Sequence, residues 1–283
     1  MGLATVLGMG VAWWWGWSWG AGLIFGLSLS CASTVVLLKA LEARGVLDSM
    51  NGRIAVGWLV VEDLATVLVL VLLPPLAGVL GGSVAEVANP QPLWVTIGKT
   101  LLQVTAFIAI MLVAGRRALP WLLWQVSRTG SRELFTLSVV TAAIGIAYGA
   151  AQLFSVSFAL GAFFAGMVMR ESEFSHRAAE ESLPLRDAFS VLFFVSVGML
   201  FEPSIMIEQP LHVLGVVAII IFGKSIAALA IVLVFRYPLN TALTVSASLA
   251  QIGEFSFILA GLGLSLGLLP AEGMSLVLAG ALI

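Results

Sequence analysis

The sequence is poor in charged residues, cysteine and histidine. Of its 283 residues only 10% are charged, and it contains one cysteine and two histidines. A soluble domain carries about 25% charged residues, so this chain has too few to cover a water-facing surface. A net charge of −2 without a basic tract excludes a nucleic-acid-binding protein. The single cysteine excludes a disulfide framework or a cysteine-based metal site.

The sequence also lacks the residue arrangements that catalysis and metal binding usually need. The two histidines, His176 and His212, are far apart and offer no metal-ligand spacing. The sequence shows no Ser–His arrangement, no pair of protease aspartates and no metal constellation at membrane depth. We therefore expect neither an enzyme nor a bound cofactor.

Long hydrophobic runs dominate the chain instead. Hydrophobic residues make up 60% of the sequence, and the mean hydropathy is +1.11. A helix needs about 20 apolar residues to cross the hydrocarbon core of a bilayer. The pattern predicts an all-α polytopic membrane protein with about ten hydrophobic segments, which in order are 2–14, 20–38, 54–73, 94–114, 134–153, 156–170, 186–201, 211–235, 241–264 and 272–283.

The positive charges alternate between loops. Of the 13 lysines and arginines, 11 lie in every second loop, namely Lys39, Arg44, Arg53, Arg116, Arg117, Arg128, Arg132, Arg170, Arg177, Arg186 and Arg236. The intervening loops contain none of them, although Glu86, Glu202 and Glu208 are there. Because cytoplasmic loops are enriched in Lys and Arg, the alternation predicts that Met1 is on the cytoplasmic side.

The first and last runs are short. The last one ends at Ile283 after 12 residues, or about 18 Å of helix, which is less than a bilayer needs. We therefore expect a partial transmembrane domain within a longer protein.

Four charged residues fall in the middle of predicted spans. Glu62 and Asp63 are adjacent in the third run, Lys224 is central in the eighth, and Glu254 is central in the ninth. Each such charge costs about 2.5–3.5 kcal/mol at the centre of a membrane helix. A buried Lys–carboxylate pair that joins helices accounts for one acid, but consecutive helix residues point about 100° apart. We therefore expect one of the two neighbouring acids to line a cavity while the other pairs or protonates.

Polar residues also interrupt the second and ninth runs. Ser33 and Thr34 lie in the second, and Gln251 and Glu254 lie in the ninth. Serine and threonine side chains bond to helical carbonyls and let a helix bend. The two runs occupy corresponding positions in halves of opposite direction, and a pair of discontinuous helices so placed is typical of a transporter's binding site.

Five motifs resemble those of a known family. They are SCASTVVLLKALEARGVL (30–47), the Glu62–Asp63 pair, SFALGAFFAGMVMRES (157–172), PLRDAFSVLFFVSVGML (184–200) and SLAQIGEFSFIL (248–259). In this order they resemble the Kef-type branch of the monovalent cation:proton antiporter-2 superfamily, in the group that carries Glu-Asp where the glutathione-gated potassium efflux proteins carry Gln-Asp.

The resemblance implies an inverted-repeat antiporter fold with two discontinuous helices that cross at the midplane. It also implies a homodimer in the bacterial inner membrane. The first-repeat N-terminal helices and the cytosolic nucleotide-binding regulatory domain of that family are expected outside residues 1–283. The charged segment 170–187 is expected to be a solvated loop, or alternatively a contact for the regulatory domain.

The charged and polar residues of the spans, together with the family resemblance, predict an ion-binding site. The resemblance implies that Asp63 carries a proton and a monovalent cation alternately. We expect Ser33, Thr34 and unwound carbonyls to supply oxygen ligands, with Gln251 among the ion-binding residues. Lys224 is expected to pair with a carboxylate when no ion is bound. Glu62 is either a second proton site or the partner of Lys224, and Glu254 is a structural or proton-bearing acid.

Three functions stay open at this point. Potassium/proton exchange is the first interpretation, a ligand-gated cation channel is the second, and a remnant that inserts without transporting is the third. Potassium and sodium are not distinguished by neutral oxygen ligands, and one or two protons per cycle are both compatible with adjacent acids.

Overall fold

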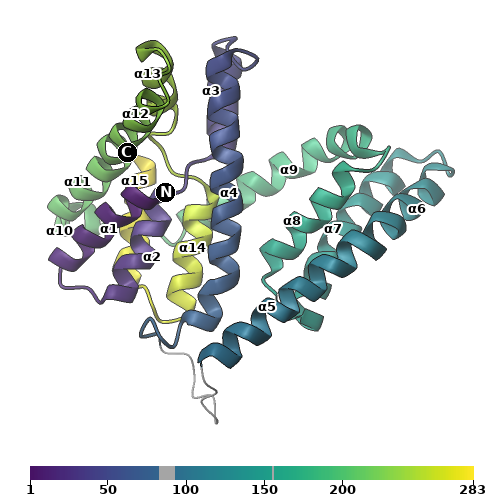
Figure 1. Ribbon diagram of the computed structural model, residues 1–283, viewed down its shortest axis with the longest axis horizontal. Coiled ribbons are helices and arrows are strands. Elements are labelled where there is room, and N and C mark those ends of the chain that lie inside the picture. The colour runs from purple at the N-terminus through teal and green to yellow at the C-terminus, as the bar shows by residue number, and fades with distance from the viewer. Residues whose placement is uncertain (83–92, 155) are drawn as a thin grey trace. The chain divides into compact units, whose positions relative to one another are not determined.

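The computed structural model describes residues 1–82, 93–154 and 156–283, so Glu86 lies outside the described residues. Every regular element in these ranges is a helix (Figure 1). The chain divides into two compact units. Of the described residues, the first contains 1–69, 76–82 and 197–283, and the second contains 70–75, 93–154 and 156–196.

The first unit holds both ends of the chain. Its helices are α1 (Gly2–Trp14), α2 (Trp19–Ser30), α3 (Thr34–Ala43), most of α4 (Met50–Leu76), α10 (Ile205–Glu208), α11 (Pro210–Ala218), α12 (Lys224–Val234), α13 (Leu239–Ser248), α14 (Glu254–Ser265) and α15 (Ala271–Leu282). A π-helical turn, Ile219–Gly223, joins α11 to α12.

The second unit is a set of packed helices. They are α5 (Leu93–Ile110), α6 (Arg116–Ser127), α7 (Arg132–Phe154), α8 (Phe158–Arg170) and α9 (Ser175–Gly198). A π-helical turn, Met111–Gly115, joins α5 to α6. The run predicted for 94–114 is helical, and the helix continues to Ser127. The loop expected for 170–187 was wrong, because the chain is helical from Ser175 onward. Glu181 explains this helix in part, because it forms an ion pair with Arg177 within α9 and another with Arg132 of α7.

Five helical stretches in the described residues are long and apolar enough to cross a membrane. They are Trp19–Ala43, Met50–Leu76, Trp94–Ser127, Arg132–Phe154 and Pro210–Val234. Further apolar helices, including α1, α8, α14 and α15, are shorter. The all-helical class with several spans is confirmed, whereas the count of ten segments and the inverted repeat stay predictions.

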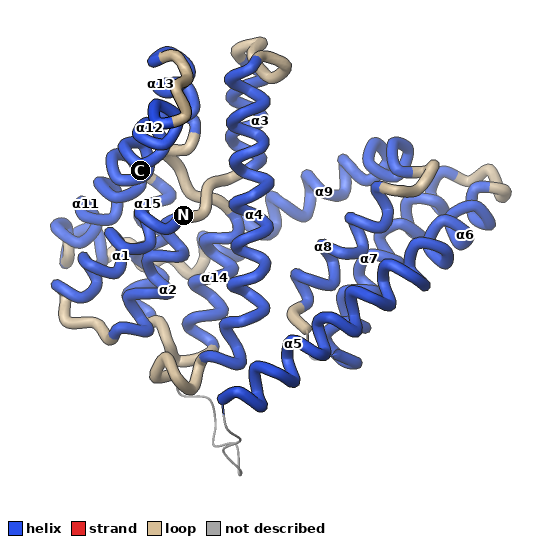
Figure 2. The backbone as a smooth tube through the Cα atoms, viewed as in Figure 1, coloured by secondary structure: helices blue, strands red, loops and turns tan. Residues whose placement is uncertain are grey.

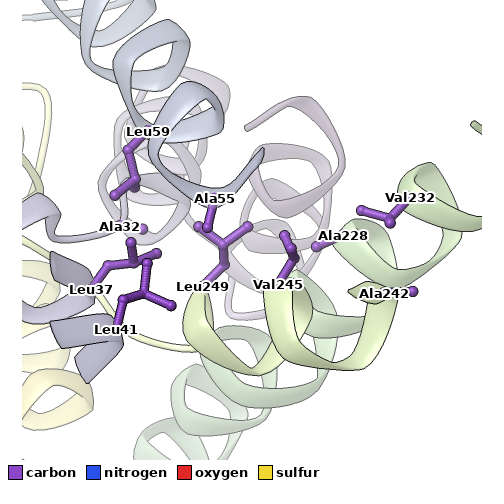
Figure 3. Packing of buried hydrophobic residues seen from close by; sticks show 10 residues of the cluster. All are labelled: Ala32, Leu37, Leu41, Ala55, Leu59, Ala228, Val232, Ala242, Val245 and Leu249. Carbon is purple, nitrogen blue, oxygen red and sulfur yellow. The ribbon is translucent and has the colours of Figure 1, made fainter. Parts of the chain in front are cut away.

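A cluster of small and branched apolar side chains packs α3, α4, α12 and α13 of the first unit together. Figure 3 shows Leu37 and Leu41 of α3 on one side of Leu249, with Ala55 and Leu59 of α4 close by. The other members are Ala32, Ala228, Val232, Ala242 and Val245. This core lies directly beside the two places where helices are interrupted, so it fixes the backbone from which the polar residues project.

Candidate functional site

Two helix interruptions form the framework of the site (Figure 2). The first separates α2 from α3 at residues 31–33, where Cys31 and Ser33 have extended backbone angles. The second separates α13 from α14 at residues 249–253, and Gly253 is extended as well. Helix ends leave backbone N–H and C=O groups without partners inside the helix. The predicted interruptions are therefore present, and each needs hydrogen bonds from elsewhere.

The two interruptions supply those bonds to each other. The Ser33 N–H donates to Oε1 of Gln251 at 2.8 Å, and Nε2 of Gln251 donates to the Ser33 carbonyl at 3.0 Å. The Ser256 hydroxyl donates to the Cys31 carbonyl at 3.2 Å. Residues about 220 positions apart in the sequence are thus bonded through main-chain groups. Both ends of the Gln251 amide are occupied, so this side chain joins the interruptions in the structure.

Gly253 allows the backbones to approach this closely. A Cβ atom on it would lie 2.6 Å from Cα of Ser33 and 2.9 Å from the Ala32 carbonyl oxygen. These are main-chain atoms, which cannot rotate away as a flexible side chain does. The crossing at this distance therefore requires glycine at position 253.

Glu62 anchors the first interruption to α4. Its Oε1 accepts from the Ala32 N–H at 2.7 Å, and its Oε2 accepts from Nε1 of Trp58 at 3.1 Å. The side chain is buried. Thr66, one turn further along α4, donates to the Glu62 carbonyl and lies 3.3 Å from Sγ of Cys31. Both carboxylate oxygens of Glu62 are therefore held by N–H donors.

Asp63 reaches a different part of the same interruption. Its Oδ2 accepts from the Thr34 hydroxyl at 2.9 Å, and its side chain is half-buried. Glu254, the first residue of α14, accepts from the Ser33 hydroxyl at 3.3 Å. Because Ser33 and Thr34 are consecutive, these two acids approach one short segment. Glu62 and Asp63 therefore bond to different groups, the first to two N–H donors and the second to a hydroxyl.

Lys224 bonds to the second interruption. Its Nζ donates to the main-chain carbonyl of Gln251 at 2.7 Å, and the side chain is buried. No carboxylate in the described part of the chain lies within ion-pair distance of this ammonium. The observed partner of this ammonium is thus a main-chain carbonyl of the second interruption, and pairing of Lys224 with a carboxylate stays a prediction. Lys224 and Glu62 nevertheless line one cavity of ≈ 80 Å³.

Negative charge is in excess around the first interruption. Glu62, Asp63 and Glu254 each bond to a residue between 32 and 34, and Lys224 is the cation that reaches the second interruption. Two helix N-termini and two C-termini meet here, so their dipoles cancel to a first approximation. Within the described residues no three acidic, histidine or cysteine side chains are placed to share one metal ion. The carboxylates surround the interruption and leave it short of positive charge.

Sequence reasoning missed several residues of this site. Trp58 is one helical turn before Glu62, a spacing that predicts contact on a helix face, but nothing in the sequence shows that its N–H meets the carboxylate. Ser256 and Thr66 resemble ordinary membrane-helix serines and threonines. Their partners lie on other segments of the chain, so only the fold assigns them.

Comparison with known proteins identifies the family. Residues 1–283 match the transmembrane sodium/hydrogen exchanger family from end to end. The chain belongs to this family. It is 60% identical over 282 residues to the "Putative cation/proton antiporter YbaL" of Escherichia coli. This alignment covers 99% of this chain and 50% of that protein.

More distant relatives carry potassium in their names. The chain is 32% identical over 283 residues to the "Putative K(+) efflux antiporter KefB" of Alkalimonas amylolytica, covering 100% of this chain and 41% of that protein. It is 32% identical over 253 residues to "K(+) efflux antiporter 4" of Arabidopsis thaliana, covering 89% of this chain and 41% of that protein. The resemblance to Kef-type cation:proton antiporters is confirmed. The chain spans half the length or less of these three relatives.

The family and the helices together define the broad class. A member of a cation/proton exchanger family with several apolar helices of spanning length is a multi-pass membrane protein of the antiporter class. The family consists of transporters, in agreement with the expectation that the chain is not an enzyme.

Proposed function

We propose that this chain carries the exchange site of a potassium/proton antiporter and that Asp63 is the group that binds the two ions in turn. The observation that carries the proposal is the half-buried Asp63 carboxylate, bonded to the Thr34 hydroxyl at a helix interruption where acids outnumber cations. A monovalent cation or a proton would supply the missing positive charge.

The competition between the two ions follows from solvation. A carboxylate held away from water favours its neutral form unless a cation compensates its charge. When the cation binds, Asp63 releases its proton, and when the proton returns, the cation leaves. Thr34 places a neutral hydroxyl oxygen beside the Asp63 carboxylate, and Ser33 places one beside the Glu254 carboxylate. Hard cations bind such oxygen ligands.

The other residues have supporting roles in this proposal. Gln251 and Lys224 hold the second interruption in place, since the amide bonds to Ser33 and the ammonium bonds to the Gln251 carbonyl. Glu62 fixes the Ala32 N–H. Glu254 accepts from the Ser33 hydroxyl and adds negative charge to the site. The alternation of lysines and arginines supports a cytoplasmic location for Met1 and the loop after α3.

Potassium is the proposed cation because two relatives of about one-third identity are named as K(+) efflux antiporters. The test uses everted membrane vesicles that contain the chain and a fluorescent probe of internal pH. After acidification by respiration, added potassium is expected to release protons from the vesicles. Asp63→Asn is expected to abolish this release, because an amide cannot exchange a proton for a cation.

Glu208→Gln is the matched control, because it removes an exposed carboxylate outside the site. It should leave exchange unchanged. Proton release by Asp63→Asn at the rate of the unaltered chain would exclude Asp63 as the carrier. Potassium current without proton movement would identify a channel instead, and the absence of any flux from the unaltered chain would refute autonomous exchange. Sodium in place of potassium tests the selectivity in the same vesicles.

A further inference from the structure

Trp58 lies one helical turn before Glu62 on α4 and is hydrogen-bonded to it. The indole Nε1–H donates to Oε2 of Glu62 at 3.1 Å, and the Ala32 N–H donates to Oε1 at 2.7 Å. Residues four apart on a helix are neighbours on one face, so the contact follows from the helix itself. An indole carries a single N–H and no acceptor. The one polar group of this side chain is therefore used on Glu62.

Two cavities border the Trp58 ring and the Glu62 side chain. The smaller, of ≈ 80 Å³, is also lined by Lys224 and Ser30. The larger, of ≈ 640 Å³, is lined mostly by apolar side chains such as Val61. An ionised oxygen that faces apolar surroundings without a hydrogen bond is costly. If the indole N–H were removed, Oε2 would lose its hydrogen bond at the edge of this apolar cavity, and binding a proton would become more favourable.

Several titratable groups of the first unit surround Glu62 and the first interruption. From α4 and from the segments packed against it, they are Met1, Cys31, Asp63, Lys224 and Glu254. None of them forms an ion pair with Glu62 in the described residues. The Lys224 ammonium donates to the Gln251 carbonyl instead. Within the part of the chain that the structure describes, the hydrogen bonds to the Glu62 carboxylate thus come from Trp58 and Ala32.

We propose that Trp58 is a positioning residue of the exchange site, which keeps Glu62 charged and directed at the first interruption. A proton on Oε2 would displace the indole N–H, and a proton on Oε1 would displace the Ala32 N–H. Glu62 is then a fixed anion, and its neighbour Asp63 is the acid of the pair that exchanges a proton. This inference rests on the proposed function of Asp63 and adds Trp58 to the site.

Trp58→Phe isolates the contribution of the indole N–H, because it keeps an aromatic side chain and removes the donor. The free Oε2 should then take up a proton more readily by a factor of about ten, which is the typical worth of a hydrogen bond to a charged group. A neutral Glu62 accepts a weaker hydrogen bond from the Ala32 N–H. It also no longer adds a negative charge beside the cation site, so cation binding should weaken.

The first test follows the proton on Glu62 and needs no transport. Infrared difference spectra of the purified chain are recorded from about pH 4 to about pH 9. The C=O stretch of a protonated carboxyl group that Glu62→Gln removes is assigned to Glu62. In Trp58→Phe this band should appear at a pH about one unit higher than in the unaltered chain, which corresponds to the tenfold change. The control Trp121→Phe, which loses an exposed indole of α6, should leave the midpoint unchanged.

Three infrared results would overturn the proposal. The first is an equal midpoint in Trp58→Phe and the unaltered chain. The second is a Glu62 band that is already complete at about pH 9 in the unaltered chain, and the third is a band that Trp58→Phe does not show even at about pH 4.

The second test measures proton release from everted vesicles at several potassium concentrations. At a pH between the two infrared midpoints, Trp58→Phe should raise the potassium KM about threefold with little change in the maximal rate, because one charge beside the site is partly lost. At a pH about two units higher, the KM should return to that of the unaltered chain, which also shows that the variant is folded. An equal fall in the maximal rate at both pH values would indicate a structural role and overturn the proposal.

The role of Trp58 and the proposed function of Asp63 fail separately. Exchange by Asp63→Asn at the rate of the unaltered chain, together with a shifted Glu62 band, would refute Asp63 as the carrier but not the control of Glu62 by Trp58. An unshifted band together with an inactive Asp63→Asn would refute the role of Trp58 alone.

Discussion

The most direct test of the close approach between residues 31–33 and 249–253 is the addition of one methyl group at Gly253. In Gly253→Ala the new Cβ would lie 2.6 Å from Cα of Ser33, whereas ordinary contacts begin at 3.4 Å. The two interruptions must therefore separate by about 0.8 Å, the difference between those distances. The Gln251–Ser33 hydrogen bonds, now 2.8 and 3.0 Å, would lengthen beyond the range in which such bonds persist.

The loss in the free energy of unfolding can be worked out from the steric overlap and from the weakened hydrogen bonds. Overpacking costs about 1–3 kcal/mol, and each hydrogen bond contributes about 1 kcal/mol. Against this, alanine reduces the backbone entropy of the unfolded chain, which favours it by about 0.4–1 kcal/mol. The backbone of Gly253 has φ −123°, which alanine adopts without strain. Steric overlap therefore prevails, and we expect a net loss of about 3 kcal/mol in the free energy of unfolding.

Two measurements report the consequence. Thermal unfolding of the purified chain should show a midpoint lowered by roughly 5–10 °C. Proton release from everted vesicles should slow strongly, because Ser33 and Thr34 would no longer be held at their present distance from Asp63 and Glu254.

Gly261→Ala is the matched control for this variant. Gly261 lies in α14, the helix that begins directly after Gly253, and a Cβ there would meet no atom within 4 Å. Alanine at this helical position should raise stability by up to about 1 kcal/mol and leave exchange unchanged. Unaltered stability and exchange in Gly253→Ala would refute the close crossing described here.

Three further predictions concern single contacts. Ser256→Ala should lower the free energy of unfolding by about 1–3 kcal/mol in a denaturation experiment, because the buried Cys31 carbonyl loses its donor. Lys224→Met should destabilise by a similar amount through the Gln251 carbonyl, whereas Lys224→Gln, which keeps a donor, should recover part of the loss. Glu181→Gln should change stability by no more than about 1 kcal/mol, because its arginine partners are 73% and 39% exposed, and a larger change would mean that the cluster is a structural centre of the second unit.

The charged residues of the site could be predicted from the sequence because charges are rare inside membrane helices. A carboxylate or an ammonium in a long apolar run is costly and therefore rare, so Glu62, Asp63, Lys224 and Glu254 could be selected without coordinates. The same reasoning failed for the charged segment 170–187. Its composition predicts a solvated loop, but ion pairs within α9 and with α7 let most of it form the start of α9.

The sequence alone therefore determined the helical class, the apolar segments and the acids at membrane depth, since the cost of burying charge depends on residue type and position along the chain. The tertiary structure decided which groups bond to one another. Lys224 meets a carbonyl rather than a carboxylate, Gln251 joins the two interruptions, and Gly253 permits their approach. Those outcomes depend on main-chain groups released by helix interruptions, and hydrogen bonds between segments about 220 residues apart leave no periodic signal in the sequence.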